Sequence, residues 1–184
     1  MTIENWKNVA AALQSIATIA SFIIGGIWVY LRFIRQQEKY PNIEFLADIE
    51  FLGFQNDWWL VEIIASIENK GKAQHKMNEF RFDLNALYPD DPIEVSKKWG
   101  GQVNFPRLIA EGSFLPEKFS FFFLDPGTKA KYSYIARIPK QARFVILHCW
   151  FKYDDDRGYS HTSEKTVAVP DPAAEKENAP REDA

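Results

Sequence analysis

Three histidines, one cysteine and a run of aspartates are the side chains best suited to metal binding or nucleophilic catalysis. His148 and Cys149 are adjacent, residues 154–156 are all Asp, His161 follows, and His75 lies far upstream. A zinc site needs three or four converging ligands. Neighbouring residues of a strand point to opposite faces, so His148 and Cys149 do not share an ion. His148 and His161 can meet across a hairpin only if the pairing register allows it.

Plainer roles fit these groups better. Cys149 shares its strand parity with Leu147 and Phe151, which predicts a buried and unreactive thiol rather than a nucleophile. His148 is expected on the solvent face. The aspartates favour a solvated turn, since calcium needs further ordered oxygen ligands. The sequence therefore predicts no catalytic residue, no metal ligand and no cofactor, and a protein that is not an enzyme. A hydrolase or metal enzyme stays as a third, weaker alternative.

Motifs and charge narrow the functional class further. The chain contains no G-x-x-x-x-G-K-[ST], H-E-x-x-H, C-x-x-C or G-x-S-x-G pattern, the motifs that mark phosphate, zinc, redox and serine-hydrolase sites. Its formal net charge is −3. Nonspecific nucleic-acid binding needs a basic face, so no nucleic-acid partner is expected. The single cysteine excludes an intramolecular disulfide and suits a reducing compartment.

An uncharged segment near the N-terminus predicts a transmembrane helix. Residues 8–31 contain no charged side chain, and as a helix they would measure about 36 Å, enough to cross a hydrocarbon core of about 30 Å. The helix is expected over residues 8–34, after a short segment 1–7 and before a juxtamembrane linker 35–40. The lipid bilayer is thus the first expected partner. The expected interface anchors are Trp6, Trp28, Tyr30, Arg32 and Arg35.

Two other interpretations of this segment fit less well. A signal peptide has a hydrophobic region of about 7–15 residues after a positive charge, whereas this run is longer and its stronger basic cluster follows it. A buried globular helix is unusual at this length. Because Arg32, Arg35 and Lys39 follow the helix and Lys7 alone precedes it, we expect the N-terminus outside and the C-terminal domain in the cytoplasm, at the cell (inner) membrane. The reverse topology is the alternative.

Small residues recur on one face of the predicted helix. Ala17, Ser21 and Gly25 are spaced four apart, and such spacing lets two helices approach closely in lipid. Gln14 and Thr18 could add hydrogen bonds between helices. We therefore predict a homo-oligomer held together by the transmembrane helix, although small residues are also common in membrane helices that do not associate.

Beyond Pro41 the pattern changes to strict alternation, which predicts β-strands. Pro, Gly, Asn and Asp separate about seven or eight such segments, and this spacing is typical of an antiparallel β-sandwich over residues 41–170. The tail 171–184 lacks large apolar residues and is expected to be disordered. The alternating runs lie at residues 43–51, 59–67, 80–84, 119–123, 132–138, 145–151 and 161–169, and residues 85–118 form a long polar stretch in which short strands could lie near residues 93–95.

Two stretches carry a family resemblance. The segment IENKGKA before an FRFDL strand, and LDPGTKAKYSYIARIP later, resemble turns and strands of bacterial immunoglobulin-like sandwiches. Together they cover about half of the globular part. The resemblance implies the fold, here an immunoglobulin-like domain on a bacterial single-pass membrane protein, and implies no substrate.

The long polar stretch holds the candidate partner-binding loop. Lys97, Lys98 and Trp99 precede two glycines, and exposed aromatics beside basic groups suit protein contacts. The alternative is a loop that folds over the sandwich with Trp99 as its plug. We interpret the chain as a membrane-anchored, non-enzymatic protein-interaction module, an adaptor or accessory subunit with a protein partner. The alternative is an oligomerising membrane effector of defence type, which disturbs the bilayer when its β domain senses a signal.

Overall fold

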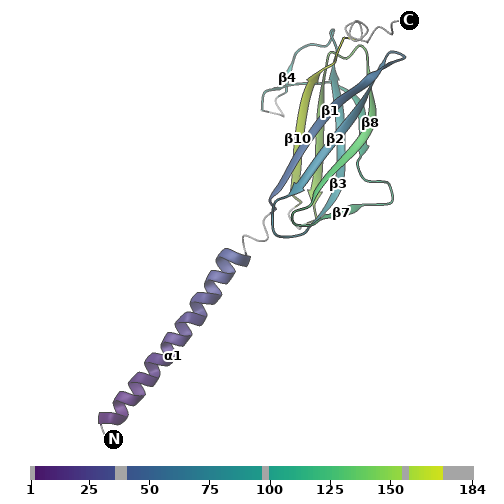
Figure 1. The fold of residues 1–184 in the computed structure, drawn as a ribbon. Coiled ribbons are helices and arrows are strands. Elements are labelled where there is room, and N and C mark those ends of the chain that lie inside the picture. The colour runs from purple at the N-terminus through teal and green to yellow at the C-terminus, as the bar shows by residue number, and fades with distance from the viewer. Residues whose placement is uncertain (1–2, 36–40, 97–99, 155–157, 172–184) are drawn as a thin grey trace, which may run out of the picture. The chain divides into compact units, whose positions relative to one another are not determined.

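A computed structural model describes residues 3–35, 41–96, 100–154 and 158–171. The chain divides into two compact units. Residues 1–41 with 71–73 form the helical unit, and residues 42–70 with 74–184 form the β domain. The two units are described separately below (Figure 1).

The helical unit consists of the α-helix α1 (Ile3–Val29) and a π-helical continuation, η1 (Tyr30–Arg35). The helix predicted over residues 8–34 is therefore present, and it begins before that span because no proline or glycine interrupts residues 3–8. The window from Trp6 to Arg32 has a mean hydropathy of 1.8, and none of it is buried within the structure. This helix is long enough and apolar enough to cross a membrane.

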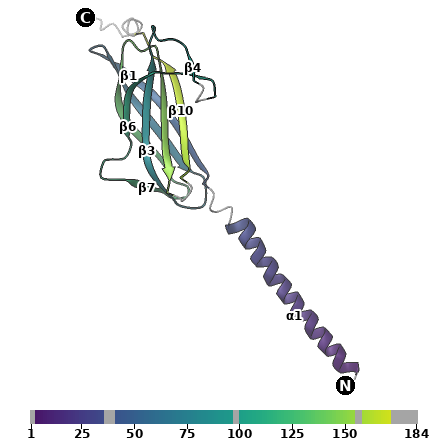
Figure 2. The same cartoon turned by 180° about the vertical axis from the view of Figure 1, so that it is seen from behind.

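The β domain confirms the prediction of a mostly β, antiparallel fold. One sheet has the order β1-β2-β8, and the second has the order β10-β9-β3-β6, with β7 also paired to β3. Figures 1 and 2 show the two sheets face to face. The strands are β1 (Ile43–Gln55), β2 (Trp58–Asn69), β3 (His75–Leu87), β4 (Val95–Ser96), β5 (Gln102–Val103), β6 (Arg107–Ser113), β7 (Phe121–Leu124), β8 (Lys129–Pro139), β9 (Phe144–Tyr153) and β10 (Ser160–Ala168).

The core lies between the two sheets because alternate residues of the long strands point inward. The residues Ile43, Phe45, Ala47 and Ile49 of β1 are buried, as the alternation predicted. The largest fully buried side chains come from both sheets and include Trp59, Ile63, Phe80, Phe82 and Phe151. Aromatic rings meet edge to face across the core, for example Phe45 and Phe151 at 5.1 Å. Burial of such side chains is the main stabilising contribution to the fold.

Local backbone geometry explains two irregular places. Asn56 and Asp57 both have positive φ, of 52° and 65°, as a tight two-residue hairpin requires. In β3, Met77 and Phe80 are both fully buried although they are three residues apart. A bulge between Asn78 and Arg81, with Glu79 at φ 51°, inserts the extra residue that restores the inward parity.

The predicted long polar stretch contains more structure than its composition indicates. β4 and β5 form a small two-stranded hairpin, and β6 is a full member of the larger sheet. β6 went unrecognised because its sequence, RLIAEGS, lacks alternation. β7 is shorter than expected and begins at Phe121. The predicted linker 35–40 and tail 171–184 lie outside the described residues, apart from residues 35 and 171.

Candidate functional site

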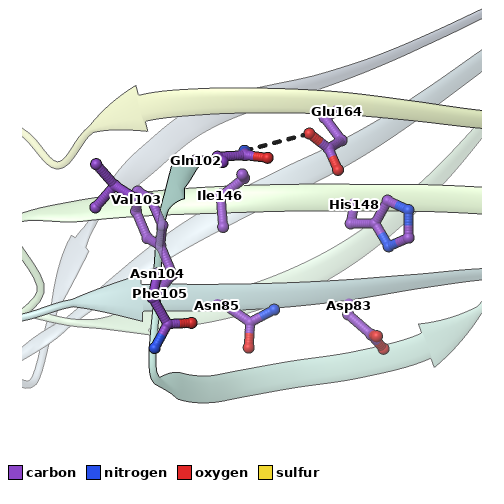
Figure 3. Close-up of a pocket in the computed structure, with 9 residues that line it drawn as sticks. All are labelled: Asp83, Asn85, Gln102, Val103, Asn104, Phe105, Ile146, His148 and Glu164. Carbon is purple, nitrogen blue, oxygen red and sulfur yellow. Dashed lines mark hydrogen bonds between the residues drawn. The ribbon is translucent and has the colours of Figure 1, made fainter. Parts of the chain in front are cut away.

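A polar row crosses the outer face of the larger sheet. Glu164 on β10 pairs in register with His148 on β9, which pairs with Asp83 on β3, which pairs with Glu111 on β6. Because paired residues of neighbouring strands project to the same side, Glu164 and Asp83 flank the His148 imidazole, and Glu111 follows Asp83 in the row. Figure 3 shows the Glu164, His148 and Asp83 side chains in this order.

The β4–β5 hairpin turns part of this face into a hollow. The hollow measures about 160 Å³ and is lined by Asp83, Asn85, Gln102, Val103, Asn104, Phe105, Ile146, His148 and Glu164. Gln102 Nε2 lies 3.4 Å from Glu164 Oε2 and connects the hairpin to β10 (Figure 3). Ile146 is only 9% exposed although it belongs to the outer face. The hairpin therefore covers the sheet here.

The hollow is acidic, and the Asp83 carboxyl in it is partly buried. Burial raises the pKa of the Asp83 carboxyl, and Glu111 raises it further, whereas His148 and Arg81 act in the opposite direction. Within the described residues, Asp83 and Glu164 form no ion pair with lysine or arginine. Carboxylates in this state are well suited to receive a basic group, especially with the neutral amides of Asn85 and Gln102 beside them.

The structure separates the residues that the sequence considered as metal ligands. His161 pairs with Phe151 and lies on the inner side, so it does not meet His148 on the outer face. Its Nδ1 lies 3.0 Å from the Tyr153 hydroxyl. No group of three or more His, Cys, Asp or Glu residues that could hold a metal ion occurs in the described part of the chain; residues 155 and 156 of the aspartate run lie outside it.

Cys149 behaves as its parity predicted. It is fully buried among the core side chains, and burial raises the pKa of its thiol to about 12. A thiol in this state is protonated at neutral pH and does not act as a nucleophile. His148 next to it faces outward and stacks on Trp150, with ring centroids 5.1 Å apart.

The predicted partner-binding residues Lys97, Lys98 and Trp99 lie outside the described residues. In the sequence they fall between β4 and β5, the hairpin that borders the hollow. Sequence reasoning missed Asp83 and Asn85 as site residues. Their alternation with buried Phe82 and Leu84 placed them on an outer face, but only the pairing register brings them beside His148.

The helix displays the predicted small-residue face. Ala17 and Ser21 line a shallow groove together with Gln14, Thr18 and Phe22. Apart from Gly25 itself, its two chain neighbours and the adjacent helix backbone, no atom lies within 4 Å of the position that a Cβ of Gly25 would occupy. Of the expected interface anchors, Trp6, Trp28 and Tyr30 are exposed, and the Arg32 guanidinium lies 5.6 Å from the Trp28 ring centroid. The Arg35 side chain lies outside the described side chains.

Comparisons with known proteins assign the chain to no family. No family model and no curated protein matches the chain. A structural-genomics target protein is 14% identical, over 70% of this chain and 87% of its own, with a TM-score of 0.44. A Bordetella pertussis protein with the provisional name ApaA is 13% identical, over 72% and 97%, with a TM-score of 0.46. A β-glucosidase from Kluyveromyces marxianus gives 13%, over 70% and 14%, with a TM-score of 0.29. At TM-scores below 0.5, these likenesses carry no argument about this chain.

Proposed function

We propose that this chain is a membrane-anchored protein-interaction module without enzymatic activity, in which α1 spans a bilayer and the β-sandwich binds a protein partner. The observation that carries the proposal is the exposure of α1. Its window Trp6–Arg32 is apolar and none of it is packed inside the structure. Phe22 is 76% exposed and Ile24 is 68% exposed. A continuous apolar surface of this length needs lipid or protein around it.

The polar residues of the helix are compatible with lipid. The Ser15, Thr18 and Ser21 hydroxyls each donate a hydrogen bond to the backbone oxygen four residues earlier, at 2.8–3.0 Å. A hydroxyl that is satisfied within its own helix does not carry the large cost of an unpaired polar group in hydrocarbon. The moderate polarity of the sequence is therefore no argument against a span.

The orientation follows from the flanking charges. Arg32, Arg35 and Lys39 follow the span, and Lys7 alone precedes it. The positive-inside rule then favours the N-terminus outside and the β domain in the cytoplasm, and the membrane that we propose is the inner membrane of a bacterium. A Thr2→Cys variant should react with an impermeant maleimide on intact cells. Labelling only after lysis would reverse the topology.

An immunoglobulin-like topology is the fold we infer for the β domain. The order β10-β9-β3 corresponds to the G-F-C order of immunoglobulin sandwiches, and β1-β2 followed by β8 corresponds to A, B and E. Such sandwiches commonly bind partners through loops and sheet faces. This correspondence supports a binding role rather than a particular chemistry.

The partner is expected to bind at the hollow beside the β4–β5 hairpin and to supply a basic side chain. Asp83 and Glu164 offer two carboxylates about this hollow. A double variant Asp83→Asn/Glu164→Gln should lose partner capture from detergent extract. The matched control is Glu50→Gln/Glu62→Gln, a cross-strand pair of carboxylates on the other sheet. Equal loss in both pairs would indicate a nonspecific charge effect and refute this site.

Membrane insertion is tested by matched lysine substitutions. Ile19 on α1 is 60% exposed and Leu46 on β1 is 58% exposed, so the two changes are alike in water. In a bilayer a central lysine costs about 2.5–3.5 kcal/mol. The Ile19→Lys variant should therefore be depleted from carbonate-washed membranes, while Leu46→Lys remains with them. Unmodified protein that stays in the supernatant without detergent and without aggregation would overturn the proposal.

A second candidate function is an oligomerising membrane effector. The groove at Ala17 and Ser21, with the Gln14 side chain on its border, favours contact between helices in lipid. Gly25 and Gly26 both have open space around them, but only Gly25 continues the small-residue face. Loss of membrane potential on induced expression, abolished by Gly25→Leu and kept by Gly26→Leu, would support the effector. An unchanged potential would favour the adaptor.

A further inference from the structure

Three phenylalanines form an exposed apolar patch at and before β7. Phe119, Phe121 and Phe123 are 62%, 41% and 53% exposed, while the alternate residues Phe122 and Leu124 point toward the core. The rings of Phe121 and Phe123 touch at a centroid distance of 5.5 Å. Three neighbouring exposed phenylalanines are costly in water, since the burial of one such side chain contributes roughly 1.5–3 kcal/mol.

The patch lies at the end of the β domain where β1 begins. The Asn69 side chain donates a hydrogen bond to the Leu124 backbone oxygen at 3.0 Å. Gly127 N donates to the Asn69 backbone oxygen at 2.8 Å, and Lys70 N donates to the Asn42 backbone oxygen at 2.8 Å. Through Asn69 and Lys70 at the end of β2, these bonds connect the end of β7 to the residue before β1. Both views of the fold show β7 at one end of the sandwich and β4 toward the other (Figures 1 and 2).

The chain between the helix and this end is short. η1 ends at Arg35 and β1 begins at Ile43. Even fully extended, the seven residues between them reach about 25 Å, at 3.3–3.6 Å per residue. Covalent length therefore sets an upper limit on the distance between the last residue of η1 and the first residue of β1.

Basic groups accompany the aromatic rings. Lys76 Nζ lies 4.4 Å from the Phe121 ring centroid and 2.6 Å from Asp154 Oδ2. Lys118 precedes the patch and is exposed. Aromatic rings beside lysines are the combination that settles at a membrane interface, where rings enter the headgroup region and ammonium groups meet lipid phosphates.

We propose that Phe119, Phe121 and Phe123 form a lipid-contact surface that holds the β domain against the headgroup region of the membrane. This inference rests on the proposed membrane anchor and adds a second contact to it. The domain would then be fixed on the bilayer at one end, and the hollow beside β4 and β5 would stay open to a partner from the aqueous side.

Depth-dependent quenching tests the proposal with the full chain in vesicles of phosphatidylcholine and phosphatidylglycerol. An environment-sensitive maleimide dye is attached to Phe123→Cys or to the control Leu108→Cys. Leu108 is 55% exposed and pairs with Asn85 in the far half of β3. Cys149 is fully buried, and we expect it not to compete for the dye. Lipids with a nitroxide near the headgroup should quench the dye at 123 and leave the dye at 108 bright.

A second dye position distinguishes lipid contact made by the phenylalanine rings from mere proximity to the membrane imposed by the short segment between η1 and β1. With the dye on Lys118→Cys, quenching should fall when Phe121→Ser and Phe123→Ser are introduced together. These side chains are exposed, so circular dichroism should remain unchanged. Quenching that stays the same after both changes would overturn the proposal.

The remaining outcomes are also decisive. A dye at 123 as bright as the dye at 108, in protein that pellets with the vesicles, overturns the lipid contact and leaves the anchor intact. Shielding of that dye from aqueous iodide without lipid quenching would assign the patch to a second protein surface, which also overturns the proposal. Protein that fails to pellet with vesicles at all refutes the anchor itself.

Discussion

Gly112 on β6 offers a sharp test of the packing between the sheets. A Cβ added at this position would lie 2.7 Å and 2.8 Å from Cε1 and Cζ of Phe82, and 3.2 Å from Cε2 of Tyr134. Carbon atoms in proteins prefer separations of about 3.5–4.0 Å. The ring of Phe82 would therefore have to move by about 0.8 Å in a region that offers it little room. Phe82 is fully buried and packs against Phe114 and Tyr134.

The expected cost of Gly112→Ala follows from two opposing effects. Overpacking of a filled core costs about 1–3 kcal/mol. Loss of glycine freedom in the unfolded chain returns about 0.4–1 kcal/mol. We expect the free energy of unfolding to fall by about 1–2 kcal/mol. Urea denaturation of the full chain in detergent micelles, followed by tryptophan fluorescence, would measure it.

The control removes the Phe82 atoms that would clash with the added Cβ. In a Phe82→Leu background the Cε1 and Cζ atoms are gone, so the additional cost of Gly112→Ala should shrink by at least about 0.5 kcal/mol, the lower end of coupling between residues in contact. A Gly112→Ala protein within about 0.5 kcal/mol of the parent, the range of a harmless surface change, would refute the reasoning. An equal penalty in both backgrounds would refute the assignment to Phe82.

Three further predictions concern buried polar groups. Burial lowers the pKa of His161, so its pKa in the folded protein lies below its pKa in the unfolded chain. Its contribution to the free energy of unfolding is therefore present above the unfolded pKa of about 6.5 and is lost as the pH falls toward the folded pKa. The His161→Phe variant should show a smaller loss of stability at low pH, measured by urea titrations at several pH values. Cys149 should not react with maleimide at neutral pH until denaturant is added, because the thiol is buried and its pKa of about 12 keeps it protonated. Rapid labelling of the native protein would contradict this prediction. Asn69→Ala should cost about 1–3 kcal/mol of unfolding free energy, because the buried Asn69 amide donates to Leu124 O at 3.0 Å, whereas Asn104→Ala on the exposed loop should cost little.

The sequence predicted those elements that obey a simple period. β1 and β8 alternate apolar and polar residues over most of their length, whereas β2 and β9 carry apolar residues at successive inward positions, and each of the four lies where its pattern predicted a strand. β6 was not predicted because Gly112 and the pair Leu108-Ile109 interrupt its alternation of apolar and polar residues. Its place is decided by tertiary contact, since Gly112 provides the close approach to Phe82 that a side chain would prevent.

The candidate site could be predicted only in part, for a similar reason. Parity placed Asp83 and His148 on outward faces, but parity does not say which outward residues become neighbours. That depends on register, and the register of β3 is shifted by the bulge at Glu79. A shift of one residue would remove Asp83 from the row with His148 and Glu164. The acidic row is thus a product of the folded sheet rather than of any motif.

The position of the row bears on the recognition role that we propose for it. Asp83 and His148 lie on β3 and β9, whose opposite faces carry fully buried residues such as Phe82, Leu84 and Cys149. A carboxylate on such a strand is held in place by the core beneath it and does not lose much freedom when a partner binds. The hairpin beside it consists of two strands of two residues each, with exposed Val95 and Val103. A charged surface on well-packed strands, next to a thinly secured hairpin, would allow the proposed site to fix a basic group and still adjust to the side chains around it.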